Sequence, residues 1–129
     1  MKKLMYSLAA QLSPIVDGRI YPMRLDAATS ESPNTLPAIV YQRISSGHII
    51  THDRQSFEIA RVQIDAYADS YKSAQETADA IDAVLCGYRG AMGDVEVGYI
   101  LRDNARDEYL PDVKMHRVII DYRMQWKDL

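Results

Sequence analysis

Apolar side chains stand at every second position of one segment near the C-terminal end, and this period of two constrains the fold more than any other feature. A β-strand sends successive side chains to opposite faces of its sheet, so one face of this strand must be buried and the other polar. The chain therefore needs a one-sided sheet with other elements packed on the apolar face. The apolar positions are Val118, Ile120, Tyr122, Met124 and Trp126.

Two amphipathic helices are expected to supply that cover. Apolar residues recur at spacings of three and four in residues 2–13 and again in residues 70–85, which predicts one helix in each range. Pro14 ends the first helix, because proline cannot continue the hydrogen-bond ladder. Asp69 or Ser70 can cap the first amides of the second.

Two further strand patterns are predicted to form a hairpin. Residues 37–46 and 57–68 are rich in apolar and β-branched side chains, and the polar segment 47–55 connects them. Within the second strand, Phe57 and Ile59 are apolar at odd positions, whereas the apolar residues that follow are at even ones. Such a change of phase predicts a bulge, or a strand tip whose apolar side faces something other than its own core.

The remaining segments complete an α+β architecture. Residues 94–102 alternate as a strand, residues 102–112 read as a charged loop, and residues 23–36 read as a long surface loop without periodicity. We expect one domain over residues 1–129, a usual length for one. The prediction is a single, mostly antiparallel sheet of about four to five strands, with two helices packed on one face and a projecting hairpin.

Composition excludes several classes of protein. The 15 basic and 18 acidic side chains leave a net charge of −3, too mild for a dedicated nucleic-acid binder. The lone cysteine, Cys86, has no partner for an intramolecular disulfide and is expected to be a buried, inert thiol. No apolar run approaches the roughly 20 residues of a membrane helix, and a signal peptide is not expected.

No motif predicts an enzyme. The chain lacks a nucleophile elbow, a phosphate-binding loop and a dinucleotide fingerprint. His48, His52 and Asp53 leave open a small metal-binding hydrolytic domain, but no third ligand of the usual kind accompanies the two histidines. We expect no metal, no cofactor and no catalytic residue.

The order of several short motifs resembles the tail-completion or tail-terminator proteins of long-tailed bacteriophages, which also occur in prophages and gene-transfer particles. The most specific pieces are a Gly-Arg-Ile-Tyr-Pro turn and an Arg-Val-Gln-Ile-Asp strand that leads into a helix. The opening helix and the helix rich in alanine and acidic residues also fit. The remaining segments that carry the resemblance are residues 14–22, 36–44, 60–68 and 117–123.

The resemblance implies a structural role without catalytic residues. Such proteins form sixfold rings on the head-proximal end of the tail tube, stop tube growth and present a surface for head–tail joining. The implied partners are further copies of the chain, the major tail tube protein and a neck or head-completion protein. The implied location is the virion, after assembly in the host bacterial cytoplasm. Another neck connector or a minor tail protein is the alternative within the same class.

A ring gives two sets of residues an expected role. The polar face of the sheet would line the channel, through which DNA passes without sequence-specific binding. Arg43 and Lys127 would join this face and leave it with a local charge of +3. Head-to-tail contacts between subunits would close the ring. The expected channel-facing residues are Arg61, Asp65, Arg117, Asp121 and Arg123; the expected subunit contacts are Ile49, Ile50, Phe57 and Ile59.

Overall fold

The computed structural model describes residues 2–25, 36–50 and 56–129, with only the backbone described at positions 48–50 and 56. Six strands form one sheet in the order β1-β2-β3-β6-β5-β4. The pair β1–β2 is parallel and the other four pairs are antiparallel. The elements are α1 (Lys2–Leu12), a 3₁₀ turn (Ser13–Val16), β1 (Ile20–Pro22), β2 (Ala38–Ile50), β3 (Ser56–Ala68), α3 (Tyr71–Leu85), β4 (Gly90–Met92), β5 (Val95–Leu110) and β6 (Met115–Asp128).

The α+β class and the two helices on one face agree with the sequence, but the sheet differs in detail. It has six strands where four to five were expected, and it is mixed because β1 runs parallel to β2. Both additional strands, β1 and β4, are three residues long. A segment this short cannot show a period of two, so only its pairing with a neighbour defines it as a strand.

The largest correction concerns β5. Residues 102–112 were expected to be a charged loop, yet β5 continues to Leu110 and pairs with β6 over almost its full length. Every side chain from Leu101 to Tyr109 is exposed, so neither face of this part of the strand shows an apolar pattern. Pairs such as Glu108 with Arg117 show that β6 supplies the hydrogen-bonding partner. A period of two in apolar residues appears only where one face of a strand is buried. It therefore cannot predict a strand that is solvated on both faces.

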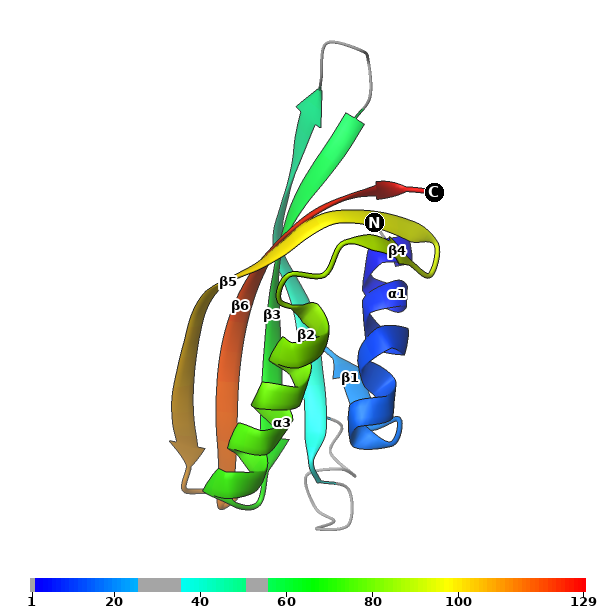
Figure 1. The fold of residues 1–129 in the computed structure, drawn as a ribbon. Helices are drawn as coiled ribbons and strands as arrows, with labels where there is room; N and C mark the ends of the chain where they lie inside the picture. Colours follow the sequence, from blue (N-terminus) through cyan, green and yellow to red (C-terminus); the bar gives the residue numbers. More distant parts are fainter. Residues whose placement is uncertain (1, 26–35, 51–55) are drawn as a thin grey trace.

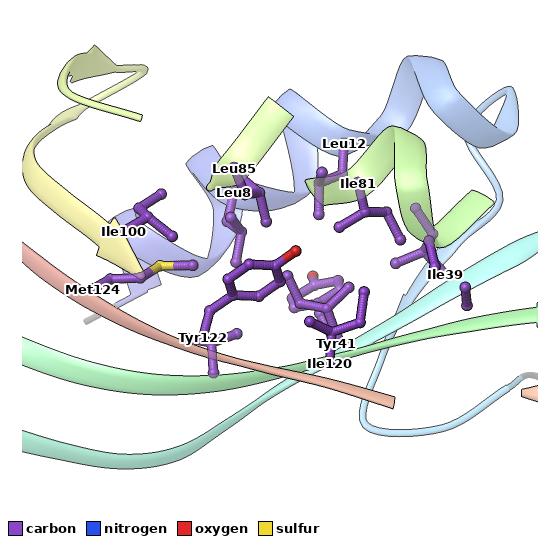
Figure 2. Close-up of a cluster of buried hydrophobic side chains, with 14 of the residues drawn as sticks. Leu8, Leu12, Ile39, Tyr41, Ile81, Leu85, Ile100, Ile120, Tyr122 and Met124 are labelled. Atoms are coloured by element: carbon purple, nitrogen blue, oxygen red, sulfur yellow. The ribbon is translucent and has the colours of Figure 1, made fainter. Parts of the chain in front are cut away.

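Both helices pack on the same face of the sheet and bury the core there (Figure 1). The N-cap of α3 is Ser70, whose Oγ accepts a hydrogen bond from the Ser73 amide at 3.1 Å. Figure 2 shows side chains from both helices facing those of the sheet, with the Tyr122 ring among them. Each large side chain buried in this way contributes about 1.5–3 kcal/mol. The labelled core residues are Leu8, Leu12, Ile39, Tyr41, Ile81, Leu85, Ile100, Ile120, Tyr122 and Met124.

The sheet curls around the helices instead of lying flat against them. β4 and the first part of β5 pass beside the N-terminal half of α1 (Figure 1). The amide of Asp94 in the β4–β5 turn donates a hydrogen bond to the Ser7 Oγ of α1 at 3.2 Å. Ser7 is itself buried, so this turn is fixed directly to the helix. In the described part of the chain, no helix is both long and apolar enough to cross a membrane.

The β2–β3 hairpin extends beyond the rest of the sheet, as Figure 1 shows. The connection is shorter than expected, because β2 runs to Ile50 and β3 begins at Ser56; residues 51–55 lie outside the described residues. A register shift lies in β2, between Arg43 and Ser45. β3 itself pairs with β6 in one unbroken register from Glu58 to Ala68. The change of apolar phase in β3 is therefore not a bulge of that strand.

Candidate assembly surface

The face of the sheet that carries no helix holds all five polar residues predicted to face a channel. In β3 and β6 the even-numbered side chains, such as Val62 and Tyr122, pack in the core. The odd-numbered side chains lie on the opposite face, and the two strands pair odd with odd, for example Arg61 with Arg123. We call this surface the helix-free face. Its members include Arg61, Asp65, Arg117, Asp121 and Arg123; whether they line a channel stays a prediction.

β5 adds charges to the helix-free face that sequence reasoning missed. Arg106 and Glu108 pair with odd-numbered residues of β6, and Asp103 bonds to Arg123 across the two strands. These charged residues were missed because the segment was expected to be a loop. Its alternating charges were the signal that could have indicated a strand. Arg43, expected on this face, pairs with Val62 and so lies on the helix side.

The expected excess of positive charge is absent from the helix-free face. Arg117, Arg123 and Lys127 each have a carboxylate within 4 Å, and the nearest atoms are 2.7, 2.7 and 3.4 Å apart respectively. Two of the acidic partners, Asp103 and Glu96, belong to β5. Three of the basic side chains on this surface are thus paired with carboxylates, whereas no ion pair is found for Arg61 among the described residues.

Among the five residues predicted to face a channel, Asp65 is the one that does not face solvent. Only 2% of its surface is exposed, and its Oδ2 accepts a hydrogen bond from Arg117 Nη2 at 2.7 Å. Burial raises the pKa of Asp65, although the Arg117 and Gln63 hydrogen bonds act in the opposite direction. The guanidinium of Arg117 also lies 5.5 Å from the centre of the Tyr67 ring. We conclude that Asp65 and Arg117 hold the sheet together and that Asp65 adds no accessible charge.

The Arg123–Asp103 ion pair is more exposed to solvent than the Asp65–Arg117 pair. Arg123 donates two hydrogen bonds to the carboxylate, from Nη2 at 2.7 Å and from Nε at 3.2 Å. These bonds are the main cause that lowers the pKa of Asp103. Beside the pair lies a shallow hollow of about 310 Å³ lined by both charged and apolar side chains. It is bordered by Ile44, Arg61, Val62, Gln63, Asp103, Asp121 and Tyr122.

A model of the tail completion protein gp17 family matches residues 6–126, which is nearly the whole chain. The protein belongs to the tail completion gp17 family. This confirms the resemblance found in the sequence motifs. No curated protein sequence matches the chain.

A chain from the virion of a native gene transfer agent particle has a similar fold. The two superpose with a TM-score of 0.69 at 13% identity, over 97% of this chain and 95% of the other. Near-complete coverage of both chains means that the curled sheet and the helices are shared as a whole. Family and fold together support a structural role in a phage tail.

Only some of the residues expected to form subunit contacts have described side chains. Phe57 and Ile59 lie on the helix-free face, because β3 continues there without a bulge. Both side chains are half-buried. Lys127 Nζ lies 5.1 Å from the centre of the Phe57 ring. The side chains of Ile49 and Ile50 lie outside the described residues.

The residues considered for a metal or hydrolytic site lie outside the part of the chain that the structure describes. They are His52, Asp53 and the side chain of His48. The described residues contain no group of three or more His, Cys, Asp or Glu side chains able to hold a metal ion. Cys86 is exposed at the end of α3, where a buried thiol was expected, because the helix has already ended at Leu85.

Proposed function

We propose that this protein caps the head-proximal end of a phage tail tube, ends tube growth and provides the surface for head–tail joining. The observation that carries the proposal is the family match over residues 6–126. The shared fold with a virion chain of a gene transfer agent supports it. The protein acts by shape and contact, without a cofactor or a catalytic residue, and its place is in the virion after assembly in the host cytoplasm.

The working form of the protein in this proposal is a homohexameric ring whose helix-free face lines the channel. DNA that passes such a surface meets charges that are already paired, such as Arg123 with Asp103. Binding to phosphates grows with the number of phosphates that a protein neutralises, so a paired surface holds DNA weakly. DNA can then move through the ring without a sequence-specific or tight stop.

The β2–β3 hairpin is the proposed contact between neighbouring subunits. It extends beyond the sheet (Figure 1). Phe57 and Ile59 place apolar surface on the face away from the core. We propose that Ile49 and Ile50 join them. A contact between two different patches of the same chain closes into a ring when the rotation per subunit permits.

A deletion of the gene tests the function. The expected lysate contains DNA-filled capsids and separate tails, and the tails vary in length because nothing ends tube growth. A plasmid copy of the wild-type gene should restore joined particles with one tail length. Joined particles of normal tail length in the deletion lysate would refute the proposal. Free tails of uniform, normal length would favour a neck connector instead.

A further inference from the structure

The groove between α1 and β2 carries large apolar side chains that its own subunit leaves uncovered. Its volume is about 470 Å³, and Tyr6 of α1 and Met23 after β1 border it. These two side chains are 67% and 68% exposed. Met5, Pro22 and Tyr41 supply the rest of the apolar lining. Exposed apolar side chains gathered around one hollow are typical of a surface that another protein covers.

The backbone of Met23 provides a second observation at the same groove. Its φ is +69°, in the left-handed region that residues other than glycine rarely adopt. The Met23 amide donates a hydrogen bond to the Tyr41 carbonyl at 2.9 Å, which fixes this residue directly after β1. A residue that is strained and adds little to the core of its own subunit is typical of a functional surface.

The β5–β6 turn also carries exposed apolar side chains. Tyr109 near the end of β5 is 51% exposed, and Val113 in the turn is 48% exposed. The ring of His116 on β6 lies 4.9 Å from the Tyr109 ring, measured between their centres. Because this contact already positions the Tyr109 ring, the side chain loses little conformational entropy on binding.

The groove and the β5–β6 turn can meet only between different copies of the chain. The groove lies on the β1–β2 side of the sheet and the turn follows β5, so β3 and β6 separate the two. Figure 1 shows β1 and β5 on opposite sides of the molecule. Two different patches on opposite sides of a subunit give a head-to-tail contact, which closes into a ring when the rotation permits.

Charge favours the same pairing of surfaces. Lys2 borders the groove, and Asp112 lies in the turn; no ion pair is found for either residue in the described part of the chain. Arg43 also lines the groove but already interacts within its own subunit. Lys114 follows Asp112 in the turn, so charge orients the contact and the apolar side chains supply most of its area.

We propose that the β5–β6 turn of one copy docks in the α1–β2 groove of the next, with Tyr109 and Val113 against Tyr6 and Met23. This inference rests on the proposed ring and adds a second contact to that of the hairpin. A tyrosine side chain buries about 150–250 Å², whereas each partner in a standard interface buries about 800 Å². The turn therefore supplies part of the interface, and the hairpin supplies more of it.

Cysteine cross-linking tests the docking directly. In a Cys86→Ser background, one batch carries Val113→Cys in the turn, and separate batches carry Tyr6→Cys or Met23→Cys at the groove. Disulfides form only when the Cα atoms are about 4.4–6.8 Å apart, so mixed rings should cross-link between copies at one groove position. Asp79→Cys on the exposed side of α3 is the control and should not cross-link with Val113→Cys. Assembled rings without a cross-link from the turn to either groove position would overturn the docking.

Tyr109→Asp and Tyr71→Asp form a matched pair for a second test. Both tyrosines are exposed and lie beside the His116 ring, but Tyr71 belongs to α3 and not to the turn. Both variants should melt within a few degrees of wild type. Tyr109→Asp should raise the concentration needed for ring formation at least tenfold, in solution or on purified tail tubes, and Tyr71→Asp should leave it unchanged. Met23→Glu should act like Tyr109→Asp from the groove side, and equal weakening by Tyr71→Asp would overturn the docking.

Exchange of the two charges tests which residues face each other. Lys2→Glu and Asp112→Lys each place like charges across the proposed contact, so each should weaken ring formation about two- to fivefold. The double variant restores an opposite pair and should form rings nearly as well as wild type. A double variant that is weaker than either single variant would overturn the pairing of turn and groove.

The outcomes separate this inference from the proposed function. Rings that form equally well with Tyr109→Asp and Met23→Glu would overturn the docking and leave the capping function intact. Rings of Met23→Glu that form normally but no longer bind tail tubes would also overturn it, because the groove would then hold the tube protein. Wild-type protein that forms no ring, either in solution or on tail tubes from the deletion lysate, would overturn both.

Discussion

Individual ion pairs on the helix-free face differ in what they contribute, and burial explains the difference. Asp65 and Arg117 are held between strands with little access to water, so loss of either partner would leave a charge without hydration. Arg123 and Asp103 are exposed, and water screens their attraction. The first pair belongs to the fold, and the second lies exposed on the helix-free face.

Asp103→Asn tests the exposed pair. Because the pKa of Asp103 is lowered in the folded protein, its ionised form adds stability at neutral pH. That stability is lost as pH falls below the ordinary aspartate value of about 3.9 and through the folded pKa. We expect a modestly lower urea midpoint for Asp103→Asn at pH 7 and no difference from wild type at low pH. Asp79→Asn, on the exposed side of α3, is the control; an equal or larger effect there would contradict this role for Asp103.

Among the elements, burial decided which could be predicted from the sequence. The two helices and the strands β2, β3 and β6 bury an apolar stripe or face, so periodicity located them. β1 and β4 are too short to show a period, and the second half of β5 is exposed on both faces. The sequence therefore predicted the part of the helix-free face that β3 and β6 form. The prediction did not include the acidic residues that β5 contributes.

The turn between β4 and β5 packs closely against α1, and one substitution can test how tightly. Gly93 has φ +56°, and a Cβ there would lie 2.6 Å from Ser7 Oγ. Gly93→Ala should lower the free energy of unfolding by about 2–4 kcal/mol, through backbone strain and a clash with a buried residue. Gly87, at φ +82°, has nothing within 4 Å of the same position, so Gly87→Ala should cost only about 1 kcal/mol. Equal losses in urea denaturation would show that Ser7 does not confine the turn.

At the scale of the whole molecule, the fold presents several surfaces that one subunit leaves incomplete. The hairpin projects beyond the sheet (Figure 1), and a groove of about 470 Å³ lies between α1 and β2. Exposed Tyr6 and Met23 line this groove, and Tyr6 stands outside the apolar stripe predicted for the helix. Surfaces of this kind fit a protein that works only in contact with other subunits.

Phe57→Asp distinguishes a subunit contact from a core contact. If Phe57 packs on a neighbouring copy, the variant should melt within a few degrees of wild type but fail to form rings and fail to complement the deletion. Tyr71→Asp is the control, because Tyr71 is an exposed aromatic side chain on α3 that lies away from the hairpin. Unfolding of the isolated Phe57→Asp monomer would show that Phe57 belongs to the core of its own subunit.

The position of the protein in the particle tests the central claim most directly. Cryo-electron microscopy of purified virions, with antibody labelling of an epitope-tagged copy that complements the deletion, would locate it. The account predicts one ring of density and label at the head-proximal end of the tail tube, in contact with both the last tube ring and a neck protein. Label along the tube, at its distal end or inside the capsid would contradict the account.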